Sequence, residues 1–165
     1  MKKIYFIFSA LLLAMMTSCS SSGSKEITPT STQFTYGDIA KYVEVVDKPY
    51  ELTCTEEDDG ATKIRLKVTL RMIKDGIKNV DVRNIRYQTV VDVADINLVD
   101  EEGYTVHTLR ATDRDKMSKF LTGSKGDTEE FFFESNYYNY DDKQFEKVSK
   151  FTPHRSVNII LKNDF

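Results

Sequence analysis

Histidine is the first side chain to examine for catalysis, and the chain has two, His107 and His154. A nucleophilic triad needs a histidine held between an acid and a serine or cysteine. His107 lies in a strand-like segment, His154 follows Pro153 in a predicted loop, and the sequence has no G-x-S-x-G nucleophile motif. The sequence therefore predicts a non-enzymatic protein, and a hydrolase is only a remote alternative.

Acidic clusters come next, because carboxylates bind hard cations such as calcium. They lie at 56–59, 100–102 and 141–142. A dedicated calcium loop spaces its oxygen ligands at alternate positions around a glycine bend, and these clusters do not. Two scattered histidines give zinc equally little support. We expect solvated turns here, with no metal and no cofactor.

The candidate binding surface is an aromatic run formed by Tyr137, Tyr138 and Tyr140. Tyrosine rings offer apolar faces and polar tips, which suit contacts with sugars or proteins. Residues 131–133, all phenylalanine, make both faces of the preceding strand apolar, so its outer face needs a cover. That cover is either another part of this chain, which we favour, or a partner.

Four basic residues share the polar face of a long predicted strand: Lys63, Arg65, Lys67 and Arg71. One interpretation is a surface that binds anionic partners. The other, which we favour, is a set of cross-strand ion pairs with acids on neighbouring strands, such as Asp81.

The first residues resemble a bacterial lipoprotein signal. Lys2 and Lys3 precede an apolar stretch at 4–16 that is too short to span a bilayer, and the sequence Met-Thr-Ser then leads into Cys19. In such a lipobox the cysteine carries fatty acids such as palmitate and becomes the new N-terminus. The resemblance implies a signal peptide at 1–19, lipidation of Cys19 and a membrane anchor; an ordinary signal peptide is the alternative.

Serine directly after the cysteine resembles outer-membrane sorting, so the expected location is the cell outer membrane, on either its periplasmic or its outer face. The formal net charge is −3, and removal of Lys2 and Lys3 makes the mature chain more acidic, which argues against a nucleic-acid partner. An unknown protein or glycan partner and a homo-oligomer stay open. With Cys19 lipidated, Cys54 cannot form an internal disulfide. It either pairs with another chain or, as we prefer, is a small buried hydrophobe.

The stretch from Lys63 to Ile73 organises the predicted fold. Apolar and polar residues alternate along it, which indicates a long β-strand with one buried face. A three-residue turn at 75–77 is predicted after it, because a two-residue turn would set polar residues opposite the buried face, whereas the longer turn sets Met72 opposite Val80. It also pairs Arg71 with Asp81 on the polar face of the hairpin.

The remaining chain divides into a tether and one domain. Residues 20–32 are rich in serine and threonine, which predicts a flexible tether, and the folded domain spans 33–165. Short helices are predicted at 112–123 and 141–150. Further strands are predicted at 42–46, 50–55, 85–99, 104–109, 129–134 and 156–162. Seven to nine strands with one or two short helices indicate an all-β, immunoglobulin-like antiparallel β-sandwich.

Taken together, the chain resembles small Bacteroides-type lipoproteins that carry an extracellular immunoglobulin-like domain of unassigned function. The resemblance rests on Cys19, the serine-rich tether, and the stretches at 63–72, 94–103 and 119–135. It implies a lipid-anchored interaction or accessory module of the cell envelope. A lipoprotein that binds carbohydrate or another small ligand through its tyrosine-rich segment is the second hypothesis.

Overall fold

The computed structural model describes residues 22–34, 38–76 and 95–153 of the chain. Its strands are β1 (Gly23–Pro29), β2 (Val43–Val45), β3 (Tyr50–Glu56), β4 (Thr62–Met72), β5 (Ile96–Val99), β6 (Thr105–Ala111), β7 (Thr128–Tyr137) and β8 (Lys150–Pro153). The helices are the 3-10 turn η1 (Asp38–Lys41) and the α-helices α1 (Arg114–Phe120) and α2 (Asp142–Lys147). Cys19, His154 and the strand predicted at 156–162 lie outside the described residues.

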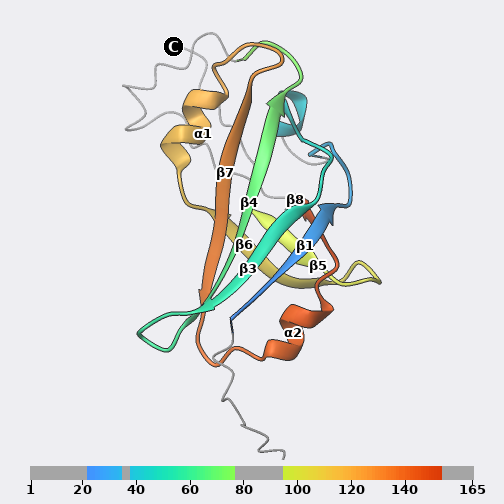
Figure 1. Cartoon of the computed structure of the whole chain (residues 1–165). Helices are drawn as coiled ribbons and strands as arrows, with labels where there is room; N and C mark the ends of the chain where they lie inside the picture. Colours follow the sequence, from blue (N-terminus) through green and yellow to red (C-terminus); the bar gives the residue numbers. More distant parts are fainter. Residues whose placement is uncertain (1–21, 35–37, 77–94, 154–165) are drawn as a thin grey trace, which may run out of the picture.

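β4 confirms the long strand predicted from the alternation. The side chains on its inner face are Thr62, Ile64, Leu66, Val68, Leu70 and Met72, and all are buried. Burying one aliphatic side chain of this size contributes about 1.5–3 kcal/mol. β4 pairs with β7 on one edge, and with β3 and then β2 on the other. β4 is therefore the central strand of the fold (Figure 1).

The strands form one sheet that closes on itself. From β4 the order runs through β3, β1, β8, β5, β6 and β7, which pairs with β4 again, while β2 extends one edge of β4. Among the described pairings only β1 with β8 is parallel. A mainly antiparallel β fold with two short α-helices is thus confirmed. The described strands form a closed sheet, not the two separate sheets of a standard immunoglobulin-like sandwich.

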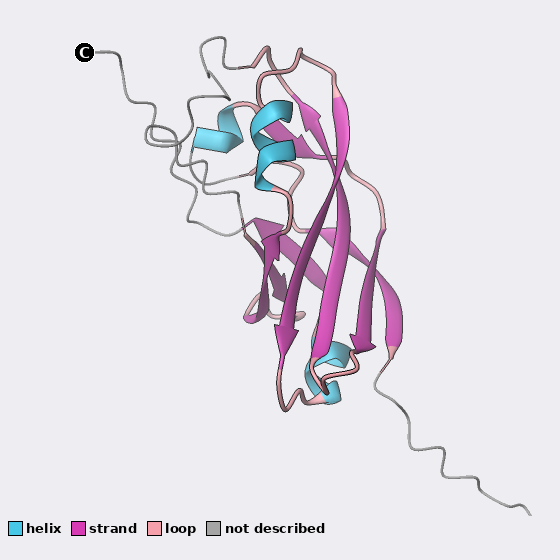
Figure 2. Cartoon of the chain, turned by 90° about the vertical axis from the view of Figure 1, so that its left-hand side faces the viewer, coloured by secondary structure: helices cyan, strands magenta, loops and turns pink. Residues whose placement is uncertain are grey.

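Helices lie at both ends of the closed sheet (Figure 2). α1 buries Met117 and Phe120, as its spacing predicts, and its N-cap is Asp113, whose carboxylate accepts the Lys116 backbone N–H at 2.8 Å. α2, predicted within 141–150, buries Phe145 at the opposite end. Together they cover the ends of an interior filled by phenylalanine, isoleucine and leucine side chains.

The prediction of a tether at 20–32 is wrong for most of its length. Gly23–Pro29 forms β1, which pairs with β3 through Ile27 and with β8 beyond it. Serine and threonine suit a strand whose outer face is wet, and one inward side chain, Ile27, is buried with 2% exposure. The serine- and threonine-rich composition suggested a tether, because one apolar residue, Ile27, is too weak a signal to indicate a strand.

The predicted hairpin after β4 is also wrong in its pairing. Arg71 has Glu44 of β2 on one edge and Thr128 of β7 on the other. Both edges of the strand are occupied at this end, so Arg71 cannot also pair with Asp81, which lies outside the described residues. Within the described residues, β5 and β6 match parts of the strands predicted at 85–99 and 104–109, and they pair antiparallel with Ile96 opposite Leu109.

Candidate functional site

The three predicted binding tyrosines do not form one surface. The rings of Tyr137 and Tyr140 lie 5.9 Å apart and both pack against His107, at centroid distances of 4.6 and 5.2 Å. Tyr138 points to solvent, with 68% exposure, and its hydroxyl donates to the Asp59 carboxylate at 3.2 Å. Two of the rings therefore face inward, and the three tyrosines named as the candidate binding surface do not share one exposed face.

Strand alternation explains these directions. Along β7, Phe131 and Phe133 are buried, so Ser135 and Tyr137 project on the same side. Phe132 projects outward and is 44% exposed, with the Arg65 guanidinium 5.4 Å from its ring centre. At Phe132 the outer face of β7 is therefore covered only in part.

A polar groove forms where β6 and β7 separate. The two strands pair only at Arg110 with Glu134 and at Ala111 with Phe133. Beyond that point the Thr108 carbonyl oxygen accepts side-chain hydrogen bonds, one from the Ser135 hydroxyl at 2.9 Å and one from the Tyr137 hydroxyl at 3.0 Å. These bonds stabilise the junction after the backbone ladder ends.

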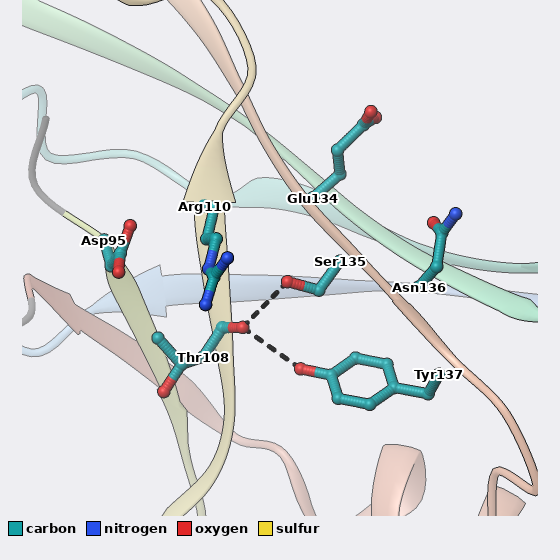
Figure 3. Close-up of a pocket in the computed structure, with 7 residues that line it drawn as sticks. All are labelled: Asp95, Thr108, Arg110, Glu134, Ser135, Asn136 and Tyr137. Atoms are coloured by element: carbon teal, nitrogen blue, oxygen red, sulfur yellow. Dashed lines mark hydrogen bonds between the residues drawn. The ribbon is translucent and has the colours of Figure 1, made fainter.

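The groove has a volume of about 760 Å³, within the size range of small-ligand sites. Its lining residues are Asp95, Thr108, Arg110, Glu134, Ser135, Asn136 and Tyr137. Figure 3 shows Ser135 and Tyr137 pointing across to Thr108, and Arg110 beside them on β6, while Glu134 and Asn136 point away from β6. The groove therefore combines one cation with several oxygen atoms.

Arg110 differs from the basic residues of β4. Each of those four forms an ion pair with an acid of another segment. The pairs are Lys63–Glu57 (2.9 Å), Arg65–Glu134 (2.8 Å), Lys67–Glu130 (2.7 Å) and Arg71–Glu44 (2.8 Å). This confirms the ion-pair interpretation of the basic face. Within the described ranges, Arg110 is exposed and forms no ion pair.

The ion pairs on β4 lie on the solvent-facing side of the sheet, so each contributes little to stability. The hydrogen bond from the Lys67 ammonium holds the pKa of Glu130 below its usual range. These cations are therefore engaged within the fold, whereas Arg110 has no ion pair among the described residues.

Beneath the groove lies a buried polar cluster around His107. Its Nε2 and the Tyr140 hydroxyl have no hydrogen-bond partner among the described residues. Burial lowers the pKa of His107 and raises that of Tyr140, so both are neutral near pH 7. Burial also raises the pKa of the Cys54 thiol, which confirms the interpretation of Cys54 as a small buried residue. No group in the cluster is activated as a nucleophile.

The acidic turns have local structural roles. Asp59 accepts the Ala61 backbone N–H at 3.0 Å, Asp100 accepts that of Tyr104 at 2.8 Å, and Asp141 caps α2. In the part of the chain that the structure describes, no group of three or more metal-binding side chains comes together.

Comparisons with protein-family models, with curated proteins and with solved structures gave no match to this chain. Across the described ranges, no helix has the length and apolar character needed to cross a membrane. Function therefore has to be argued from the groove and from the sequence.

Sequence reasoning missed Thr108, Arg110 and Ser135. One signal was available for part of the site: Ser135 and Tyr137 share the alternation of Phe131 and Phe133, which sets their side chains on the inner face of β7. Whether Arg110 has an acidic partner depends on which residues the fold brings near it, and no sequence pattern indicates that.

Proposed function

We propose that this chain is a non-enzymatic, lipid-anchored binding module of the cell envelope, and that the groove beside Arg110 is its binding surface. Cys19 would carry the lipid, and the anchor would hold the folded domain at the outer membrane. The buried histidine, tyrosine and cysteine are neutral and unactivated, which favours binding over catalysis.

The observation that carries this proposal is the contrast between Arg110 and the paired cations of β4. A guanidinium beside a polar groove, without an acid partner among the described residues, is suited to a ligand that brings its own anion or acceptor. A solvated surface arginine with no role is the simpler alternative, and the experiment below separates the two.

The proposal extends to the fold. β1 pairs with β3 through Gly23–Ile27 and with β8 through Thr28–Pro29, and β6 pairs with β5 and then, at Arg110–Ala111, with β7. Two packed sheets that share β1 at one corner and β6 at the other would produce the observed closed sheet. This supports describing the fold as an immunoglobulin-like sandwich closed at both corners.

The test is site-specific photo-crosslinking in intact cells. A benzoylphenylalanine replaces Asn136, an exposed residue at the groove, in the full-length protein. The control places the same probe at Tyr104, a 73% exposed residue of the β5–β6 turn that does not line the groove. We expect a defined adduct at Asn136 and none of the same mass at Tyr104. Equal labelling at both positions, or none at Asn136, would overturn the proposal.

A further inference from the structure

We infer that the groove beside Arg110 takes a saccharide that carries a carboxylate, such as a chain containing uronic acid. This inference rests on the proposed binding function of the same groove and names its ligand class. It follows from counting which groups at the groove are left to donate and which to accept a hydrogen bond.

Three hydroxyl groups line the groove, and each uses its only proton within the protein. The Ser135 and Tyr137 hydroxyls both meet the Thr108 carbonyl oxygen, which can only accept, so both must donate. The Thr108 hydroxyl donates to the Asn97 side-chain oxygen at 2.8 Å. Toward a ligand these three groups therefore offer lone pairs only.

A carboxylate adds to this excess of acceptors. Asp95 also lines the groove, and an ionised carboxylate accepts but cannot donate. Glu134 and Asn136 point away from β6, and the Glu134 carboxylate is paired with Arg65, so neither side chain is counted here. Asp95, Thr108, Ser135 and Tyr137 thus form an oxygen wall along the groove. A ligand that fits this oxygen wall must bring several hydrogen-bond donors of its own, as a polyhydroxylated molecule does.

Arg110 supplies hydrogen-bond donors to the groove instead of acceptors. Its guanidinium carries five N–H donors in a planar fork that matches a carboxylate in a bidentate pair. Burial raises the pKa of the Tyr137 hydroxyl, and the nearby charge of Arg110 opposes that shift in small part. One ligand can meet both demands when its hydroxyl groups donate to the oxygen wall and its carboxylate binds Arg110.

Other ligand classes match fewer of these groups. A phosphate ester without hydroxyl groups would satisfy Arg110 but brings no donors for the oxygen wall. A neutral sugar would meet the wall and leave the guanidinium without an anion. An apolar ligand would leave both unsatisfied, at a cost for every desolvated polar group.

The experiment compares trigalacturonate with its trimethyl ester, in which a methyl group neutralises each carboxylate and the hydroxyl groups are unchanged. Binding to the full-length lipoprotein in detergent micelles is measured by isothermal titration calorimetry. We expect the acid to bind at least about tenfold more tightly than the ester, because the ester loses the charged pair with Arg110.

Matched variants test the residue. Arg110→Ala should weaken trigalacturonate binding at least about tenfold, while Arg71→Ala, which removes the same charge from an exposed site on β4, should change it less than about twofold. Arg110 is exposed and has no ion pair among the described residues, so we expect the variant to fold. Its far-ultraviolet circular dichroism checks this.

Two results would overturn the inference but leave the proposed function standing. The first is equal affinity for acid and ester, or no effect of Arg110→Ala on either. The second is no saccharide binding together with a specific adduct at Asn136 in cells. Absence of both saccharide binding and the adduct would overturn the inference and the proposed function together.

Discussion

His107 is a histidine that the fold keeps neutral. The residue is 7% exposed, its ring packs against the rings of Tyr137 and Tyr140, and burial lowers its pKa. Chemical activation would require a partner that stabilises charge on the ring, and the aromatic neighbours do not provide one. At the scale of the residue, the interior is therefore a packed core with a polar edge, which agrees with a binding role for the protein.

This burial predicts a pH dependence of stability. The unfolded chain takes up a proton on His107 near pH 6.5, whereas the folded state does so only at lower pH. Below about pH 6.5 the unfolded state thus binds more protons, so the free energy of unfolding falls as the pH falls. His107→Phe should flatten this slope between pH 7 and 5, by up to about 1.4 kcal/mol per pH unit. Urea titrations at several pH values measure it.

His154→Phe is the comparison, because the chain has only these two histidines. If His154→Phe removed the slope and His107→Phe kept it, the assignment to the buried ring would be wrong.

At the scale of the element, β1 is the clearest departure from expectation. Its serine-rich sequence predicts a tether, yet the strand pairs with both β3 and β8 and supplies Ile27 to the core. Without β1 the closed sheet would be open between β3 and β8. β1 is therefore a structural part of the domain.

Ile27→Ala should lower the free energy of unfolding by about 2–4 kcal/mol, because it removes a buried side chain and leaves a cavity. Ser24→Ala, at an exposed position of the same strand, should change it by less than about 0.5 kcal/mol. Chemical denaturation measures both. A loss below 0.5 kcal/mol for Ile27→Ala would restore the tether interpretation.

The junction of β6 and β7 gives a second prediction at this scale. The Thr108 carbonyl oxygen has two hydroxyl donors, so each of Ser135→Ala and Tyr137→Phe alone leaves it one partner. The double variant leaves it none from these side chains and should cost more than the sum of the single losses, by about 0.5–1 kcal/mol. A double-mutant cycle in urea that proved additive would contradict this account of the junction.

Elements that are set by the local sequence could be predicted, whereas features that depend on contacts between distant residues could not. Ile64, Leu66 and Val68 alternate strictly with charged residues, and this local signal correctly predicted β4. The partners of β4 were not predictable in the same way, because β2 and β7 come from distant parts of the chain and fill both edges near Arg71. The groove depends on where β6 and β7 part, which is set by the closure of the whole sheet.

At the scale of the whole molecule, the closed sheet provides a rigid support, and the groove opens where β6 and β7 separate. The proposed lipid on Cys19 would come directly before the described part of the chain, which begins three residues later. β1 follows almost at once, so the domain would sit close to the membrane surface. This differs from the long flexible tether expected from composition.

The anchor gives a prediction of its own. Cys19→Ser should move the protein from the membrane fraction to the soluble fraction and abolish labelling with a palmitate analogue, because the acylated thiol is removed. Cys54→Ala, which changes the only other cysteine, should leave both unchanged. Fractionation followed by immunoblotting measures the distribution. Persistent labelling of Cys19→Ser would contradict the lipoprotein assignment.

Ligand binding in the groove beside Arg110 can be tested in the cell. The measurement is the yield of the Asn136 photo-adduct in intact cells expressing either Arg110→Ala or Arg71→Ala. We predict that Arg110→Ala reduces the yield at least about tenfold, while Arg71→Ala leaves it within about twofold of the parent protein. Equal yields in the two variants would contradict the claim.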